Sequence, residues 1–203
     1  GKNGSGKTML MRAISGLILP TSGKVYINDK ELGRHISFPP SIGILIENPS
    51  FISNYTGFKN LKILASIQNR ISDDEIRDAI RKVGLDPDDK RTFKKYSLGM
   101  KQRLGIAAAI MERPDIVILD EPFSGLDPVN SRILQDVVME LIGQNKIVIF
   151  SSHQMSYVEE FCKDIVIINK GDVVLSGDLD NIKREFGKNQ LVVSAVDKTL
   201  DVL

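Results

Sequence analysis

The chain begins with GKNGSGKT (residues 1–8), which fits the pattern G-x-x-x-x-G-K-[ST]. Glycine allows positive φ angles and close approach of other groups, so the backbone N–H groups of such a loop can turn inward around an anion. The alternative is a flexible turn, but chance gives the four fixed positions in only roughly one chain in a hundred of this length. The stretch therefore predicts a phosphate-binding loop, followed by a helix whose N-terminal end faces the same anion.

Residues of this loop have expected tasks in nucleotide binding. Lys7 would reach the β- and γ-phosphates, and the Thr8 hydroxyl would ligate Mg²⁺. The residues expected to hold the nucleotide are Gly1, Asn3, Gly4, Ser5, Gly6, Lys7, Thr8 and Met9.

A second stretch, IVILDEP (residues 116–122), is an apolar run that ends in two acids. It predicts a buried strand that places Asp120 and Glu121 at its carboxyl end, where open α/β sheets bind ligands. Asp120 is placed to hold Mg²⁺ through water, and Glu121 can polarise a water molecule that attacks the γ-phosphate. Two adjacent acids at a strand end can also be merely solvated, but a phosphate loop in the same chain favours catalysis.

Short apolar runs alternate with helical patterns along the chain, which predicts an α/β fold with a mainly parallel sheet flanked by helices. The strands are expected at residues 24–28, 42–46, 116–120, 147–152 and 164–169. The last of them is followed by Lys170, Gly171 and a further apolar run, which predicts a hairpin.

Between Glu47 and Ser97 the strand signals stop and helical signals replace them. Thr56 can cap one helix, and Ser72 with Glu75 forms a capping box for a second helix that ends near Gly84. We therefore expect an ATPase-type core over residues 1–47 and 104–186, with its first strands missing. A helical subdomain would cover 48–103, and a C-terminal extension 187–203.

The composition excludes several classes of protein. The net charge is +1, from 27 basic and 26 acidic residues, so no overall field attracts nucleic acid or an anionic membrane. Cys162 is the only cysteine, which fits a reducing compartment, and we expect it to be a half-buried structural thiol. No apolar run approaches the roughly 20 residues of a membrane span, so any membrane contact should come through a partner.

Three further stretches carry a resemblance to a known family: YSLGMKQR (residues 96–103), SGLDP (124–128) and SSHQM (151–155). With the loop and the acidic strand, in this order, they resemble the nucleotide-binding domain of ATP-binding cassette (ABC) ATPases, which have a P-loop NTPase core. The resemblance covers nearly the whole chain. The nucleotide is then ATP, and Ser97 and Gly99 would face the γ-phosphate held by a second subunit in a head-to-tail dimer. Ser97 can also cap a helix that runs to about residue 111, and an ordinary capped helix is the alternative interpretation.

The resemblance also implies roles for three polar residues. His153 stands where the family has a switch histidine that bonds the γ-phosphate, and Asp127 where it has a dimer-contact aspartate, although the same residues read as an Asp-Pro turn. Glu47 stands where the family usually has a glutamine, and we expect it to ligate Mg²⁺. The signature departs from its usual form at Leu98 and Met100, which bears on the affinity of that contact and not on its position.

Glu47 and the signature together resemble the bacitracin and lantibiotic resistance branch. The resemblance implies an Mg²⁺-dependent ATPase subunit of an exporter of a peptide antibiotic or related compound. It would act in the cytoplasm, against the cytoplasmic face of the cell membrane. Its partners would be transmembrane permease subunits and a second ATPase subunit, in a homodimer or a heterodimer, and no nucleic acid. The strand that feeds the loop and an upstream aromatic residue for adenine are expected to precede residue 1.

Two other functions are weighed against this one. A soluble mechanochemical ABC ATPase acting on nucleic acid or ribosomes would need a long coiled coil in the insertion or a tandem second cassette. A small-molecule kinase would use the same loop but has no use for the signature stretch.

Overall fold

The structure, a computed structural model that describes residues 4–186, contains a parallel three-stranded sheet. Its strands lie in the order β3 (Ile42–Leu45), β4 (Ile116–Leu119) and β5 (Ile147–Phe150), so that β4 is paired on both sides. The last three residues of β4 are completely buried. Burial on both faces explains why this strand is a continuous apolar run and not an alternating one.

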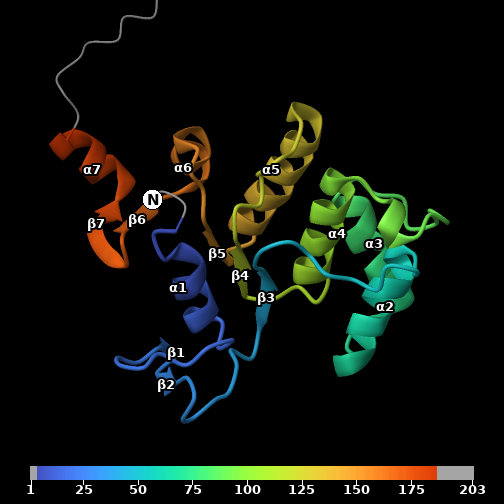
Figure 1. Ribbon diagram of the computed structural model, residues 1–203, viewed down its shortest axis with the longest axis horizontal. Helices are drawn as coiled ribbons and strands as arrows, with labels where there is room; N and C mark the ends of the chain where they lie inside the picture. Colours follow the sequence, from blue (N-terminus) through green and yellow to red (C-terminus); the bar gives the residue numbers. More distant parts are fainter. Residues whose placement is uncertain (1–3, 187–203) are drawn as a thin grey trace, which may run out of the picture.

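Helices lie on both sides of these strands. In chain order they are α1 (Lys7–Ile14), α2 (Gly57–Gln68), α3 (Asp73–Lys82), the short 3₁₀ helix η1 (Phe93–Lys95), α4 (Leu98–Ile110), α5 (Pro128–Gly143), α6 (Met155–Phe161) and α7 (Leu179–Phe186). Two hairpins are also present, β1 (Tyr26–Ile27) with β2 (Lys30–Glu31) and β6 (Asp164–Asn169) with β7 (Asp172–Asp178). Figure 1 shows α2, α3 and α4 gathered on one side of the three strands and α1 with the β6–β7 hairpin on the other.

This arrangement confirms the predicted α/β class, with a parallel sheet flanked by helices. Residues 48–97 contain helices and no strand, as the pattern indicated. The limits of a helical subdomain at residues 48 and 103 stay a prediction, and the predicted extension at 187–203 lies outside the described residues. Within residues 4–186, no helix combines the length and the apolar character that crossing a membrane would need.

The predicted helix starts are confirmed by their caps. The Thr56 hydroxyl accepts a hydrogen bond from the backbone N–H of Lys59, and Ser72 and Glu75 form the complete capping box of α3. The chain leaves α3 through Gly84, whose φ of 69° suits glycine best. Each cap satisfies N–H groups that the first turn of a helix leaves without partners.

The strand at residues 24–28 is shorter than predicted, because a tight turn interrupts it. Asn28 and Asp29 have φ angles of 48° and 61°, so Tyr26–Ile27 folds back directly onto Lys30–Glu31. Two central residues with positive φ are the geometry of a type I′ hairpin turn, for which Asn and Asp are favoured. The turn at Lys170 and Gly171 repeats this geometry, and there the predicted hairpin is confirmed.

Helix α4 lies unusually close to β3, at the centre of the main hydrophobic core. Eight of its thirteen residues are buried. A Cβ atom on Gly43 of β3 would stand 1.8 Å from the carbonyl oxygen of Ala109, and one on Gly105 of α4 would stand 2.8 Å from the Leu45 side chain. Glycine at these two facing positions is therefore what allows the helix and the strand to approach.

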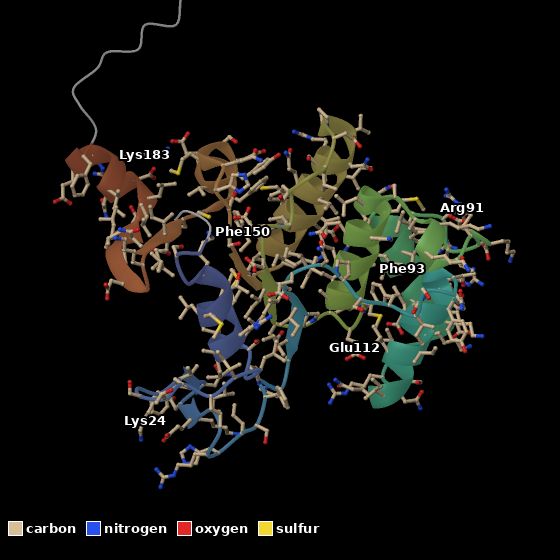
Figure 2. The ribbon with its side chains drawn as sticks, in the orientation of Figure 1. Lys24, Arg91, Phe93, Glu112, Phe150 and Lys183 are labelled. Carbon is tan, nitrogen blue, oxygen red and sulfur yellow. The ribbon has the colours of Figure 1, made fainter. Side chains whose placement is uncertain are left out.

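Two aromatic groups attach loops and helices to this core. The ring of Phe123, just after β4, lies 6.1 Å from Phe150 of β5 and 5.8 Å from Phe161 of α6. In the second group, Phe93 of η1 meets Phe51 edge-on at 5.1 Å. Figure 2 shows Phe93 among α2, α3 and α4, and Phe150 apart from it beside the strands. The first group fixes α6 near the carboxyl end of β4.

We expect Gly43→Ala to lower the free energy of unfolding by at least about 3 kcal/mol, because its Cβ would overlap the Ala109 carbonyl unless α4 and β3 separate. Thermal unfolding followed by circular dichroism measures the change. Gly143→Ala is the matched control, since a Cβ there has no neighbour within 4 Å and alanine favours the helix. Equal melting temperatures for the two variants would contradict the close approach.

Candidate functional site

A cavity of about 230 Å³ lies at the carboxyl end of β4, where α1 begins. Its lining consists of Gly4, Ser5, Gly6, Lys7, Thr8, Met9, Asp120 and Glu121. Gly6 stands at the N-cap of α1 with a φ of 108°, a left-handed conformation, and its lack of a side chain leaves the first-turn N–H groups uncapped. The glycine loop and the acidic strand therefore meet at one place. Gly1 and Asn3, also expected there, lie outside the described residues.

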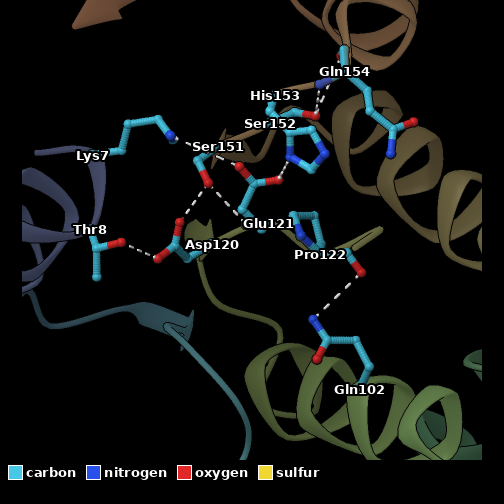
Figure 3. A network of polar contacts seen from close by, with 10 residues as sticks. All are labelled: Lys7, Thr8, Gln102, Asp120, Glu121, Pro122, Ser151, Ser152, His153 and Gln154. Atoms are coloured by element: carbon cyan, nitrogen blue, oxygen red, sulfur yellow. Dashed lines mark hydrogen bonds and ion pairs between the residues drawn. The ribbon is translucent and has the colours of Figure 1, made fainter. Parts of the chain in front are cut away.

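The Asp120 carboxylate joins three elements of the fold. Asp120 is only 8% exposed, and both of its carboxylate oxygens accept hydrogen bonds from hydroxyl groups. Thr8 on α1 donates to Oδ2 at 2.6 Å, and Ser151, just after β5, donates to Oδ1 at 2.5 Å (Figure 3). A buried carboxylate is stable only when its oxygens find such donors, so these bonds fix α1 and β5 against the end of β4.

Glu121 is held at its backbone and at its side chain. Its φ of 48° turns the chain away from β4, and its N–H donates to Ser151 Oγ at 2.9 Å. Its Oε2 lies 2.8 Å from His153 Nδ1, and its Oε1 lies 3.9 Å from Lys7 Nζ (Figure 3). Oε1 is buried and has no hydrogen-bond partner among residues 4–186. The carboxylate thus lies between the loop lysine and the histidine, with one oxygen open to a further donor.

The hydroxyl of Ser5, in the loop, is a second polar group of the site that lacks a hydrogen-bond partner among residues 4–186. The residue is 5% exposed, and its hydroxyl makes no hydrogen bond within the described part of the chain. Its carbonyl oxygen accepts from the N–H of Gly171, which ties the loop to the turn of the β6–β7 hairpin. A buried hydroxyl without a partner is costly, and a bound ligand that supplies a hydrogen bond would remove this cost.

Glu47 lies outside the cavity lining, at the end of β3. Its φ is 63°, and its carboxylate makes an ion pair of 2.7 Å with Arg12 of α1. The Glu47 side chain is 61% exposed. The structure therefore does not bring Glu47 into direct contact with Thr8 and Asp120, and its role as a metal ligand stays a prediction.

The signature residues are also absent from the cavity lining. Ser97 caps α4 by accepting from the N–H of Met100 at 3.2 Å, as predicted. A Cβ on Gly99 would touch Leu126, so this glycine lies against the loop that precedes α5. A role of Ser97 and Gly99 in ATP binding stays a prediction.

Asp127 forms the predicted turn, as the N-cap of α5 with Pro128 at its first position. Its carboxylate accepts from the backbone N–H and the side chain of Asn130. The backbone bond, with the side-chain bond second, holds the pKa of Asp127 below its ordinary value.

Cys162 is half-buried, and burial raises the pKa of its thiol, which agrees with the structural role expected of it.

Sequence reasoning missed Ser151. It lies two residues before His153, and its hydroxyl bonds the carboxylate of Asp120 and the backbone N–H of Glu121. The signal that could have found it is its place at the carboxyl end of the strand next to β4, since neighbouring parallel strands end at the same edge of a sheet.

A glycine loop that opens a helix, next to a parallel strand ending in two carboxylates, defines the P-loop NTPase class. The comparisons with known proteins narrow this class. Residues 1–124 match the family model described as ABC transporter. The uncharacterized ABC transporter ATP-binding protein YybJ of Bacillus subtilis is 43% identical over 171 residues, which cover 84% of this chain and 78% of YybJ.

Two relatives have named roles. The bacitracin transport ATP-binding protein BcrA of Enterococcus faecalis is 40% identical, over 86% of this chain and 57% of BcrA. The lantibiotic transport ATP-binding protein SrtF of Streptococcus pyogenes is 34% identical, over 95% of this chain and 83% of SrtF. The chain belongs to the ABC transporter family and carries its ATP-binding, ATPase domain.

Solved structures agree with this assignment. An ATP-binding subunit of an ABC transporter superimposes with a TM-score of 0.79 at 30% identity, over 92% of this chain and 80% of that one. The post-hydrolysis dimer of the cassette MJ0796 bound to ADP and Pi gives a TM-score of 0.78, over 88% of this chain and 83% of that one. The identity to MJ0796 is 22%, so this likeness supports the fold alone.

Proposed function

We propose that this chain is the Mg²⁺-dependent ATPase subunit of an ABC exporter, which binds ATP between two copies arranged head to tail and drives attached membrane subunits. The observation that carries the proposal is the cavity in which the loop faces Asp120 and Glu121, with His153 on the outer side of Glu121. Such a constellation suits phosphoryl transfer to water, which needs a cradle for phosphates, a metal site and a group that orients the water.

The donor set at the cavity fits Mg²⁺. Thr8 and Asp120 supply hydroxyl and carboxylate oxygens, the hard ligands that this ion prefers, and the cavity is open to phosphate oxygens and water as further ligands. When bound, Mg²⁺ would neutralise charge on the β- and γ-phosphates.

The remaining groups have roles that follow from their positions. Lys7 would compensate the negative charge of the phosphates, and Glu121 would orient the attacking water and accept its proton. His153 already bonds Glu121 and is exposed enough, at 50% of its side chain, to reach a phosphate as well. Met9, in the first turn of α1, lines the cavity and would contact the nucleotide there.

A second copy of the chain would complete the site. Ser97 and Gly99 do not line the cavity, although the N-terminal end of α4 is the kind of site that attracts an anion. In a head-to-tail dimer, α4 of one copy would face the phosphates held by the other. MJ0796, a cassette of the same fold, is described as a dimer, and this chain would pair in a comparable way.

The described roles of two relatives support a class of exported compound. BcrA is described as a bacitracin transport protein and SrtF as a lantibiotic transport protein, so a peptide antibiotic or related compound is the substrate class proposed. Transmembrane permease subunits would dock on the cytoplasmic side around residues 51–58, where Ile52 is 48% exposed. The mechanochemical alternative is not favoured, because α2 and α3 have only 12 and 10 residues and form no long coiled coil.

If the chain drives an exporter of peptide antibiotics, it should make a host resistant to such an antibiotic. The chain, expressed with the membrane proteins encoded beside its gene in a sensitive host, should raise the minimum inhibitory concentration of bacitracin or of a lantibiotic. Lys7→Ala should abolish this effect, because a fixed charge against the phosphates is lost. Unchanged sensitivity to both compounds would reject the substrate class, and resistance that survives Lys7→Ala would reject the mechanism.

We expect Glu121→Gln to leave ATP binding intact and to slow hydrolysis by roughly 10²- to 10⁴-fold, since the amide keeps the shape but cannot accept a proton. Phosphate release and equilibrium binding of ATP measure the two effects. The variant should also accumulate an ATP-bound dimer, visible by size-exclusion chromatography. A monomer at saturating ATP would speak against the head-to-tail assembly.

The Glu47 proposal is tested by varying Mg²⁺. Exposed ion pairs contribute only about 0–1 kcal/mol, so Arg12 releases Glu47 at little cost. Glu47→Gln should then need several times more Mg²⁺ for half-maximal hydrolysis, because a neutral amide is a weaker ligand. Arg12→Gln is the control and should not raise this concentration. If the titration curves of wild type and Glu47→Gln coincide, Glu47 does not bind the metal.

A further inference from the structure

The hydroxyl of Ser151 is shared between the two carboxylate residues of the site. Ser151 follows β5 and is 5% exposed. Its Oγ donates to Asp120 Oδ1 at 2.5 Å and accepts from the backbone N–H of Glu121 at 2.9 Å (Figure 3). One side chain from a neighbouring strand therefore contacts both residues that follow β4.

The direction of these two bonds is fixed by chemistry. A backbone N–H can only donate, so Ser151 Oγ must accept from Glu121. A hydroxyl has one hydrogen, which is then left for the Asp120 oxygen. Because Thr8 donates to the other Asp120 oxygen, the two hydroxyl groups together fix the plane of this carboxylate. Thr8 Oγ1 keeps its lone pairs for a metal, whereas Ser151 Oγ has used its hydrogen on Asp120 and one of its two lone pairs on the Glu121 N–H.

Glu121 depends on the segment that begins at Ser151. With a φ of 48°, Glu121 adopts a left-handed conformation that non-glycine residues avoid unless the surroundings impose it. The bond from its N–H to Ser151 Oγ holds this turn, and His153 from the same segment holds its side chain at 2.8 Å. Loss of the Ser151 hydroxyl would leave a part-buried N–H without its partner and loosen the turn.

We propose that Ser151 is a positioning residue for the hydrolysis of ATP. Its hydroxyl holds both the metal-facing carboxylate of Asp120 and the backbone turn of Glu121. The metal site and the water-orienting group therefore keep fixed positions relative to each other. This role rests on the proposed function of the cavity. The adjacent Ser152 has no such role, because its hydroxyl bonds only the backbone of Gln154.

The test compares Ser151→Thr with Ser151→Val, which have the same shape and differ only in the hydroxyl. Both add a methyl group at the same buried position, and valine also carries a methyl where threonine keeps the hydroxyl, so packing effects largely cancel in the comparison. We expect Ser151→Thr to keep kcat within about threefold of wild type and Ser151→Val to lower kcat about tenfold or more. The KM for Mg·ATP should change less than kcat, because the loop contacts remain. Ser152→Ala is the control. It removes a neighbouring hydroxyl and should change neither kcat nor the KM for Mg·ATP.

A second readout does not depend on turnover. The ratio of the ATP dissociation constants in EDTA and in Mg²⁺ measures how well the site uses the metal, and fluorescence of a labelled ATP analogue can report it. Ser151→Val should reduce this ratio several-fold relative to Ser151→Thr, with little change in EDTA. A merely structural role would lower the melting temperature of the valine variant and leave the ratio unchanged.

The outcomes distinguish a failure of the positioning role of Ser151 from a failure of the proposed function. Equal kcat values and equal ratios for the threonine and valine variants would overturn the positioning role. If wild type binds ATP without hydrolysing it, the hydrolytic part of the proposed function fails, and the Mg²⁺ ratio still decides whether Ser151 positions Asp120.

Discussion

The buried carboxylate of Asp120 is the interaction on which the site depends. At 8% exposure it cannot rely on water, so it requires donors from the protein. These come from Thr8 at the start of α1 and from Ser151 at the end of β5. The phosphate loop is thus positioned by a bond to the strand that carries the acids, and the segment with His153 is positioned by the same carboxylate.

A second constraint concerns α4. Glycine at positions 43 and 105 lets this helix lie directly on β3, and the helix ends near the strand that the sheet buries most deeply. The N-terminal end of α4, with Ser97, therefore belongs to a helix that packs in the core. A surface at this end of the helix, offered to a second copy of the chain, would therefore be positioned relative to β4 by the packing of α4 on β3.

The sequence predicts what depends on local chemistry. Continuous apolar runs gave β3, β4 and β5, and the capping residues Thr56, Ser72 and Ser97 gave three helix starts. It does not predict what depends on register. Leu119 pairs with Phe150, so the residues after the two strands meet, and this alone brings the Ser151 hydroxyl to the acids. The turn at Asn28 and Asp29 is not predicted, because the strand expected at residues 24–28 includes Asn28 and the charged pair Lys30–Glu31 carries no strand signal.

The charges around the cavity make a cation part of the ligand. The lining contains two carboxylates, on Asp120 and Glu121, and one lysine, so the site by itself does not attract a polyanion strongly. Thr8 and Ser151 hold Asp120 by neutral hydroxyl groups and leave its charge uncompensated. Arg12 neutralises Glu47 just outside the lining, which removes a third repulsive charge while no metal is bound. A triphosphate should therefore bind together with a divalent ion that offsets the charges of Asp120 and Glu121.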